Sequence, residues 1–343
     1  MNKSELPFIT ISMPVRNEGK YIAVTIMELL KQDYPDDRFE IIVADGMSDD
    51  NTKEIIMRIA SENPQVIYTH NKKRLSSSGR NIGFKQGRGD LFLVVDGHCA
   101  IRNNNMLKNL VACFEKSKAE CLGRPQPFLM PKELTTQRAI AMARKSKIGH
   151  SNNSYIHTQQ EGYVSPISVG CAYKKEVFEK IGYVDESFDA CEDVEFNHRI
   201  EKAGLKAYLC PKIAIYYYAR DSYISLFKQQ ARYGRGRARY IRKHPEGFTI
   251  ETVAPGVIVL YFTTIPFISL YFSNHLMMII AYASFAILYL IILTTIGIAE
   301  AKNNLKLGMQ IALALLVTHI AFGWGFLRTV FLPKTMLNQS KAR

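Results

Sequence analysis

Short apolar runs alternate with segments of helical periodicity over the first two hundred residues of the chain. The apolar runs at 8–15, 40–44, 66–69 and 91–95 predict buried β-strands. Apolar residues at a helical spacing predict helices over 21–32 and 51–60, and the serine-rich start of 76–85 is typical of a helix N-terminus. This βαβαβ order predicts an α/β fold with a mostly parallel sheet that is covered on both faces.

The second half of this region alternates in the same way, but with less regularity. Residues 124–165 are rich in Ser, Asn, Gln and His, and we expect a mobile loop there. The pattern favours helices over 174–181 and 192–203 and one or two strands over 206–218. We therefore predict a single α/β domain over 1–225.

The pattern changes in the C-terminal third, where three stretches of about 20 residues lack Asp, Glu, Lys and Arg. These stretches, 252–272, 276–298 and 307–327, are each long enough to cross a bilayer as a helix. Pro255 and Pro266 could make the first one kink or re-enter. We expect three spans, although they place the basic C-terminal tail outside, against the positive-inside rule; a re-entrant first segment returns that tail to the cytoplasm.

The net charge of +13 indicates an anionic partner, and its distribution narrows the choice. Between 228 and 243 there are seven Lys or Arg residues and no acid, directly before the apolar stretches. This order favours an anionic membrane surface, and no nucleic-acid-binding motif is present, so we expect no nucleic-acid partner. We predict a basic interfacial segment at 226–250, a membrane region with two to three helices at 251–330 and a polar tail at 331–343.

The short polar N-terminus does not resemble a signal peptide, so we expect a multi-pass protein of the inner (plasma) membrane with its α/β domain in the cytoplasm. The six cysteines show no Cys-x-x-Cys spacing. We therefore predict buried thiols in a reducing compartment. The sequence gives no indication of the oligomeric state.

Three of the predicted strands run into polar clusters, at 14–18, 45–50 and 96–98, and an acidic cluster at 189–193 opens a predicted helix. The carboxyl ends of the strands in an open α/β sheet meet along one crevice, where ligands bind. Asp96 and His98 are two residues apart and could face the same side of an extended loop. Taken singly, Asp45 and Asp49 are also ordinary turn and helix-cap residues.

Together these clusters resemble the inverting family 2 glycosyltransferases of the GT-A fold. The resemblance is carried in order by Pro14-Val15-Arg16-Asn17-Glu18, by 45–52, by Gly79-Arg80-Asn81-Ile82-Gly83, by Asp96-Gly97-His98 and by Glu192-Asp193. The run 232–237, before the apolar stretches, is similar to that of the subgroup with a succinoglycan glucosyltransferase. The resemblance covers residues 8–245.

The resemblance implies a role for ten residues. The donor-binding positions are Pro14, Arg16, Glu18, Asp45, Asp49, Arg80 and Asp96. Asp96 and His98 would hold Mn²⁺ or Mg²⁺, with His98 in place of the family's second carboxylate. Asp193 matches the catalytic base, and Glu192 would orient the loop or the acceptor. Both could instead be first-turn acids that the helix dipole favours.

The implied activity is transfer of a hexose, glucose first among the candidates, from a UDP-sugar to a lipid-linked oligosaccharide in exopolysaccharide or other cell-surface glycan synthesis. Three alternatives stay open. They are a polyprenyl-phosphate glycosyltransferase, a processive synthase suggested by the run 229–233, and a non-catalytic membrane scaffold with a degenerate transferase fold. An acceptor phosphate is already anionic, so the first alternative needs no base.

Overall fold

The computed structural model describes residues 6–133, 135–150, 155, 158–168, 170–272, 275–302 and 304–332. The chain divides into two compact units, one made of 1–128 and 153–218 and the other of 129–152 and 219–343. One continuous helix, from Tyr223 to Lys243, runs through position 225, where we predict the end of the α/β domain. The predicted tail lies outside the described residues, apart from 331 and 332.

The first unit is built on an eight-stranded sheet in the order β3-β2-β1-β4-β9-β6-β10-β8. Its strands are β1 Ile9–Val15, β2 Phe39–Asp45, β3 Val66–His70, β4 Leu91–Val94, β6 Cys121–Gly123, β8 Gly162–Val164, β9 Ala172–Lys174 and β10 Ala207–Leu209. Strands β1, β2, β3 and β4 pair in parallel, whereas β9 runs antiparallel to β4 and β6. The mostly parallel sheet predicted from the sequence is therefore confirmed.

A second, three-stranded sheet has the order β5-β11-β7. It consists of β5 Cys99–Ala100, β11 Tyr216–Tyr218 and β7 Phe128–Leu129. Strand β5 follows the polar loop 95–98, and β11 pairs with it in antiparallel fashion, Tyr217 opposite Cys99. This pairing brings a segment more than a hundred residues away in sequence beside the end of β4.

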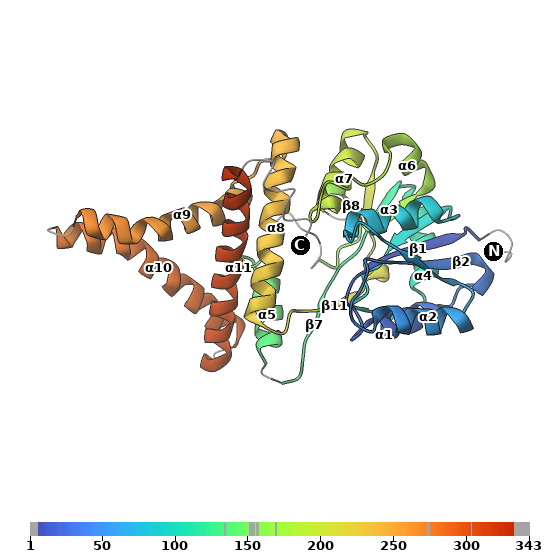
Figure 1. Ribbon diagram of the computed structural model, residues 1–343, viewed down its shortest axis with the longest axis horizontal. Helices are drawn as coiled ribbons and strands as arrows, with labels where there is room; N and C mark the ends of the chain where they lie inside the picture. Colours follow the sequence, from blue (N-terminus) through green and yellow to red (C-terminus); the bar gives the residue numbers. More distant parts are fainter. Residues whose placement is uncertain are drawn as a thin grey trace. The chain divides into compact units, whose positions relative to one another are not determined.

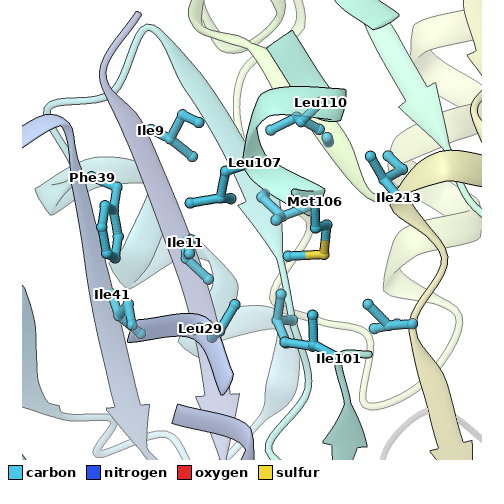
Figure 2. Packing of buried hydrophobic residues seen from close by; sticks show 14 of the residues in the cluster. Ile9, Ile11, Leu29, Phe39, Ile41, Ile101, Met106, Leu107, Leu110 and Ile213 are labelled. Atoms are coloured by element: carbon cyan, nitrogen blue, oxygen red, sulfur yellow. The ribbon is translucent and has the colours of Figure 1, made fainter. Parts of the chain in front are cut away.

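Helices cover both faces of the large sheet (Figure 1). They are α1 Ile22–Leu30, α2 Thr52–Glu62, α3 Ser76–Gln86, α4 Met106–Ser117, α6 Lys175–Ile181 and α7 Glu192–Lys202. Alternate residues of a strand point to opposite faces, so Leu91 and Leu93 join one core cluster and Phe92 and Val94 join the other. Figure 2 shows the first core, where Ile9 and Ile11 of β1 pack near Leu107 and Leu110 of α4.

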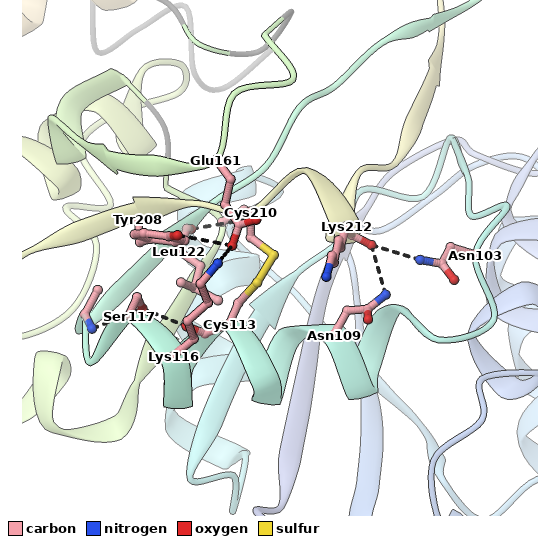
Figure 3. The surroundings of a disulfide bond; sticks show 12 residues. Asn103, Asn109, Cys113, Lys116, Ser117, Leu122, Glu161, Tyr208, Cys210 and Lys212 are labelled. Carbon is pink, nitrogen blue, oxygen red and sulfur yellow. Dashed lines mark hydrogen bonds and ion pairs between the residues drawn. A yellow bond between two sulfur atoms is a disulfide. The ribbon is translucent and has the colours of Figure 1, made fainter.

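The cysteine prediction is wrong for two of the six residues. Cys113 of α4 and Cys210, just after β10, form a disulfide across a separation of 97 residues (Figure 3). The sequence offers no spacing signal for it, because the pairing depends on how α4 and the end of β10 pack in the folded domain. Cys99, Cys121 and Cys171 are buried thiols, as predicted, and Cys191 is half-buried.

The regular structure described in the second unit is helical, apart from Leu129 at the end of β7. It comprises α5 Thr136–Lys145, α8 Tyr223–Lys243, α9 Ile250–Tyr271, α10 Leu276–Glu300 and α11 Leu305–Phe331. Helix α5 lies within 124–165, the stretch in which we expect a mobile loop, and its start is capped by the Thr135 hydroxyl, which accepts a hydrogen bond from the Arg138 amide. Helices α9, α10 and α11 are each long and apolar enough to cross a membrane.

Candidate functional site

Helix α3 lies very close to strand β1, and this closeness fixes the position of Arg80. A Cβ atom added to Gly79 would lie 2.8 Å from Cβ of Pro14, and one added to Gly83 would overlap the Ser12 side chain. The two glycines thus let the helix backbone rest on the strand. Pro14 itself is buried in this packing, so its ring contributes to the core beneath the site.

Arg80 is a largely buried cation facing acidic side chains. Its Nη2 atom lies 3.4 Å from Oε1 of Glu192, and its side chain is 13% exposed. Burial alone would lower the pKa of this guanidinium, but Glu192, followed by Asp193, outweighs that effect and raises it. The buried Nε atom of Arg80 has no hydrogen-bond partner in the described part of the chain. Such an orphan donor on a fixed cation suits an anionic ligand.

The two acids at the start of α7 occupy different environments. Glu192 is buried and accepts a hydrogen bond from the Ser76 hydroxyl in addition to its ion pair with Arg80. Asp193 is half-buried, and its Oδ1 accepts a hydrogen bond from the amide of Val194. Glu192 therefore holds Arg80 in place, and Asp193 is the more accessible carboxylate. A carboxylate acting as a base must be reachable by the hydroxyl it deprotonates.

Asp96, directly after β4, is the centre of a second group of contacts. Its Oδ2 accepts a hydrogen bond of 2.8 Å from the hydroxyl of Tyr217 on β11. Burial alone raises the pKa of Asp96, but the charge of Arg80, followed by that of His98, leaves it below its usual value. Asp96 is therefore an ionised carboxylate at neutral pH, as a metal ligand must be.

His98 is oriented by Glu18, which extends from the loop after β1. The Nδ1 atom of His98 lies 2.8 Å from Oε1 of Glu18. Metal-binding histidines typically donate one ring N–H to a carboxylate, which fixes the tautomer and directs the other nitrogen at the ion. Asp96 and His98 thus fit a divalent cation, with a donor set suited to Mn²⁺. The Glu18 side chain supports the histidine.

The loop after β2 is organised by Asp45. Its Oδ1 accepts hydrogen bonds from the amide and hydroxyl of Ser48, at 3.1 and 2.6 Å, and its Oδ2 accepts one from the Tyr68 hydroxyl at 3.0 Å. Only 1% of Asp45 is exposed. Oδ1 is thus engaged in the turn that the sequence allowed as an alternative, and Oδ2 is bound by Tyr68 of the neighbouring strand β3. The amide of Asp49 donates to Asn17 Oδ1, which joins this loop to the one after β1.

Six of the ten predicted site residues lie in one cluster, and the other four lie on β1, β2 and the loops that follow these strands. Glu18, Asp96 and His98 converge with Arg80, Glu192 and Asp193 at the end of β4 and the start of α7. Arg16 is exposed on the loop after β1, and Asp49 is exposed after β2. Pro14 is buried against Gly79 of α3, and Asp45 is hydrogen-bonded to Ser48 and Tyr68.

Two residues near Asp96, the half-buried Tyr217 and the buried Arg124, were not predicted. Tyr217 lies in a run of three tyrosines, and that run does not indicate a contact with Asp96. Arg124 is 3% exposed and donates from Nη2 to the carbonyl of Val94, while its Nε and Nη1 atoms have no hydrogen-bond partner among the described residues. Arg124 also lowers the pKa of Asp96. The signal available in the sequence was an isolated arginine after an apolar run.

Comparison with known proteins identifies the family of the chain. Residues 10–182, just over half of the chain, match the family model for glycosyl transferase family 2. The chain belongs to glycosyl transferase family 2. It is 31% identical to the succinoglycan biosynthesis protein ExoA of Rhizobium meliloti, over 68% of this chain and 70% of the relative. The predicted resemblance to this family, and to its succinoglycan subgroup, is thus confirmed, and the protein is a glycosyltransferase.

Further relatives extend the comparison. A Methanococcus voltae enzyme is 30% identical over 69% of this chain and 74% of the relative; it is named a dolichyl N-acetyl-α-D-glucosaminyl phosphate 3-β-D-2,3-diacetamido-2,3-dideoxy-β-D-glucuronosyltransferase. Among solved structures, the mannosyltransferase PcManGT of Pyrobaculum calidifontis, in complex with GDP-Man and Mn²⁺, superposes with a TM-score of 0.59 at 16% identity, covering 96% of this chain and 88% of that one. S. aureus TarS 1–349 with UDP gives 0.52 at 15% identity, over 94% and 90%. The GT-A fold is therefore confirmed.

Proposed function

We propose that this glycosyltransferase transfers a hexose, glucose first among the candidates, from a UDP-sugar to a hydroxyl of a lipid-linked oligosaccharide, for exopolysaccharide or other cell-surface glycan synthesis. The observation that carries the proposal is the convergence of Arg80, Asp96 and Asp193 in one charged cluster. The names of the Rhizobium and Methanococcus relatives support a glycan pathway and a lipid-linked acceptor.

In this proposal, Asp193 removes the proton of the acceptor hydroxyl as that oxygen attacks the anomeric carbon. Direct displacement inverts the anomeric centre, so an α-linked donor gives a β-linkage. Arg80, held by Glu192, stabilises the developing negative charge of the leaving UDP. Asp96 and His98 would hold Mn²⁺ or Mg²⁺, which when bound supplies Lewis-acid neutralisation of the diphosphate. The solved neighbour with GDP-Man and Mn²⁺ supports a metal of this kind.

The acceptor hydroxyl distinguishes this proposal from its first alternative. A polyprenyl-phosphate acceptor is already anionic and needs no base, so loss of Asp193 would matter less there. A scaffold would retain UDP binding without turnover. A processive synthase would extend one product many times before release.

We further propose that the protein is a multi-pass protein of the plasma membrane, with its α/β domain on the cytoplasmic side, and that α9 and α10 are the helices that cross. Helix α11 packs beside α8 for most of its length: the Tyr223 hydroxyl donates to the Gln310 carbonyl at one end, and Arg242 donates to the Thr329 carbonyl at the other. The seven Lys and Arg residues of α8 make its insertion into hydrocarbon costly. Helix α11, which packs against α8, therefore lies with α8 at the membrane surface.

Burial supports the same division of the apolar helices. In α11, 44% of the 18-residue apolar window is buried within the protein, against 11% in α9 and in α10. The His319 ring of α11 hydrogen-bonds the carbonyl of Ile148, beyond α5. Figure 1 shows α9 and α10 meeting at a tip away from α11. Two spans return the chain to its starting side and keep the basic tail inside, in line with the positive-inside rule.

The activity is tested by UDP release from UDP-glucose, UDP-galactose and UDP-N-acetylglucosamine by membranes that contain the protein, with and without Mn²⁺ and with a lipid extract from the source cell as acceptor. We expect metal-dependent release from one donor. Release from none of them would contradict the proposal.

The topology is tested by labelling with a membrane-impermeant maleimide, which should label His275→Cys in intact cells and Lys341→Cys only after permeabilisation. Labelling of Lys341→Cys in intact cells would contradict the two-span arrangement and support three spans.

A further inference from the structure

A basic groove lies between α8 and α11, within the second unit. It has a volume of about 420 Å³ and is lined by Phe227, Lys228, Ala231, Arg232, Arg235, Trp324, Gly325 and Arg328. None of these residues belongs to the cluster around Arg80 and Asp96. The groove is therefore a separate feature that the transfer reaction, as described above, does not use.

The floor of the groove exists because the two helices touch through small residues. A Cβ atom added to Gly325 would overlap the backbone carbonyl of Ala231, so only glycine allows this approach. Both residues are buried. The backbones meet at the bottom, and the longer side chains on either side rise as walls. The recess is thus part of the helix packing.

The walls carry four cations. Lys228, Arg232 and Arg235 follow the i, i+4, i+7 spacing that places them on one face of α8, and Arg328 faces them from α11. Like charges four residues apart repel one another on a helix. Neither α8 nor α11, both described over their whole length, contains Asp or Glu. This concentration of positive charge would attract a polyanion.

Two aromatic side chains complete the groove. Trp324 is 50% exposed and Phe227 is 38% exposed, although both are large and apolar. Tryptophan is enriched at membrane–water interfaces, where its ring lies at the level of the lipid headgroups. Arg328 comes one turn after Trp324, at the end of the apolar run of α11. Cations and an interfacial ring together match a ligand that is charged at one end and apolar at the other.

We propose that this groove binds the diphosphate group of an isoprenoid-type lipid, and so holds the carrier of the acceptor. The inference rests on the proposed function. Guanidinium groups bind phosphate oxygens in a bidentate manner, and three arginines with a lysine suit two linked phosphates better than a singly charged phospholipid headgroup. The exposed faces of Trp324 and Phe227 would contact the first part of the lipid chain.

Trp324 is the only tryptophan of the chain, so its fluorescence reports on this groove alone. The detergent-solubilised full-length protein is titrated with farnesyl diphosphate in the absence of any sugar donor. Inorganic pyrophosphate, farnesol and phosphatidylglycerol are titrated in parallel. We expect a saturable change in Trp324 emission with farnesyl diphosphate at concentrations about tenfold lower than with the other three. Equal responses to pyrophosphate or to phosphatidylglycerol would overturn the proposal.

Variants assign the binding to the four cations. The double variant Arg232→Gln/Arg328→Gln should weaken farnesyl diphosphate binding by about tenfold or more, and Arg232→Lys/Arg328→Lys should restore most of it. Lys306→Gln, an exposed cation at the far end of α11, is the matched control and should bind like the wild type. Equilibrium dialysis with labelled farnesyl diphosphate gives the same constants without a fluorescent reporter. Unchanged binding in the double glutamine variant would refute the assignment.

The same titration separates this inference from the proposed function. Asp193→Asn should bind farnesyl diphosphate with unchanged affinity, since the groove does not include Asp193. An active transferase that fails to bind farnesyl diphosphate would refute the groove and leave the reaction standing. Binding without UDP release from any donor would support the groove and contradict the reaction.

Discussion

The imidazole of His98 and the carboxylate of Glu18 lie 2.8 Å apart, from Nδ1 to Oε1, although 80 residues separate them in the chain. This pair joins the loops after β1 and β4, and it gives His98 a defined orientation toward the site. In the proposed metal site, the Glu18 carboxylate would fix the tautomer of His98 and direct its other ring nitrogen at the ion.

Glu18→Gln should therefore weaken metal affinity about 10- to 100-fold without abolishing the fold. The measurement is the Mn²⁺ concentration that gives half-maximal UDP release, which should rise while the maximal rate is largely recovered at high Mn²⁺. Glu54→Gln, an exposed acid on α2, serves as the control. An unchanged Mn²⁺ dependence in Glu18→Gln would show that His98 does not act at a metal.

Under the proposed mechanism, Arg80→Gln should lower donor affinity by about 10- to 100-fold, because it would remove a charge-assisted contact to the diphosphate. The measurement is the dissociation constant for UDP, taken by calorimetry. Arg58→Gln, which removes an exposed cation from α2, should bind UDP normally. Equal affinities of the wild type and Arg80→Gln for UDP would show that Arg80 does not bind the donor and only holds Glu192 in place.

Glu186 ties the loop before α7 to α3, and this contact predicts a pH dependence of stability. It accepts hydrogen bonds from Lys73 at 2.6 Å and from Asn81 at 2.8 Å. Burial raises its pKa, but these two donors hold it below the usual value. The stabilisation is thus present above the unfolded glutamate pKa of about 4.3 and is lost as the pH falls through the lower folded value.

Glu186→Gln should consequently lower the unfolding free energy by about 1 kcal/mol at pH 7 and by much less at pH 3.5. Thermal melting of the solubilised protein at the two pH values measures this difference. A destabilisation that is the same at both would show that the charge of Glu186 is not the cause.

The disulfide between Cys113 and Cys210 should protect both residues from alkylation in the denatured protein until a reductant is added. A loop of this length predicts that Cys113→Ser lowers the unfolding free energy by about 4 kcal/mol. Mass spectrometry after maleimide treatment tests the pairing. Modification of both cysteines without reductant would show that they are free thiols and do not form a disulfide.

The sequence predicted features that depend on local periodicity. Strand β4 and the polar residues that follow it were visible because an apolar run ends at Asp96, and parallel strands deliver their ends to one edge. The contact of Tyr217 with Asp96 was not predictable, because it depends on the pairing of β11 with β5. The engagement of both Asp45 oxygens by Ser48 and Tyr68 likewise depends on loop geometry that a motif does not specify.

The central claim is that Asp193 acts as the base toward an acceptor hydroxyl. Its most direct test is the rate of sugar transfer by Asp193→Asn at saturating donor and metal, with Glu201→Gln on the same helix as the control. We predict a loss of about 10²- to 10⁴-fold, with donor affinity within about twofold of the wild type. A transfer rate for Asp193→Asn close to that of the wild type would contradict the account and favour an acceptor that is already anionic.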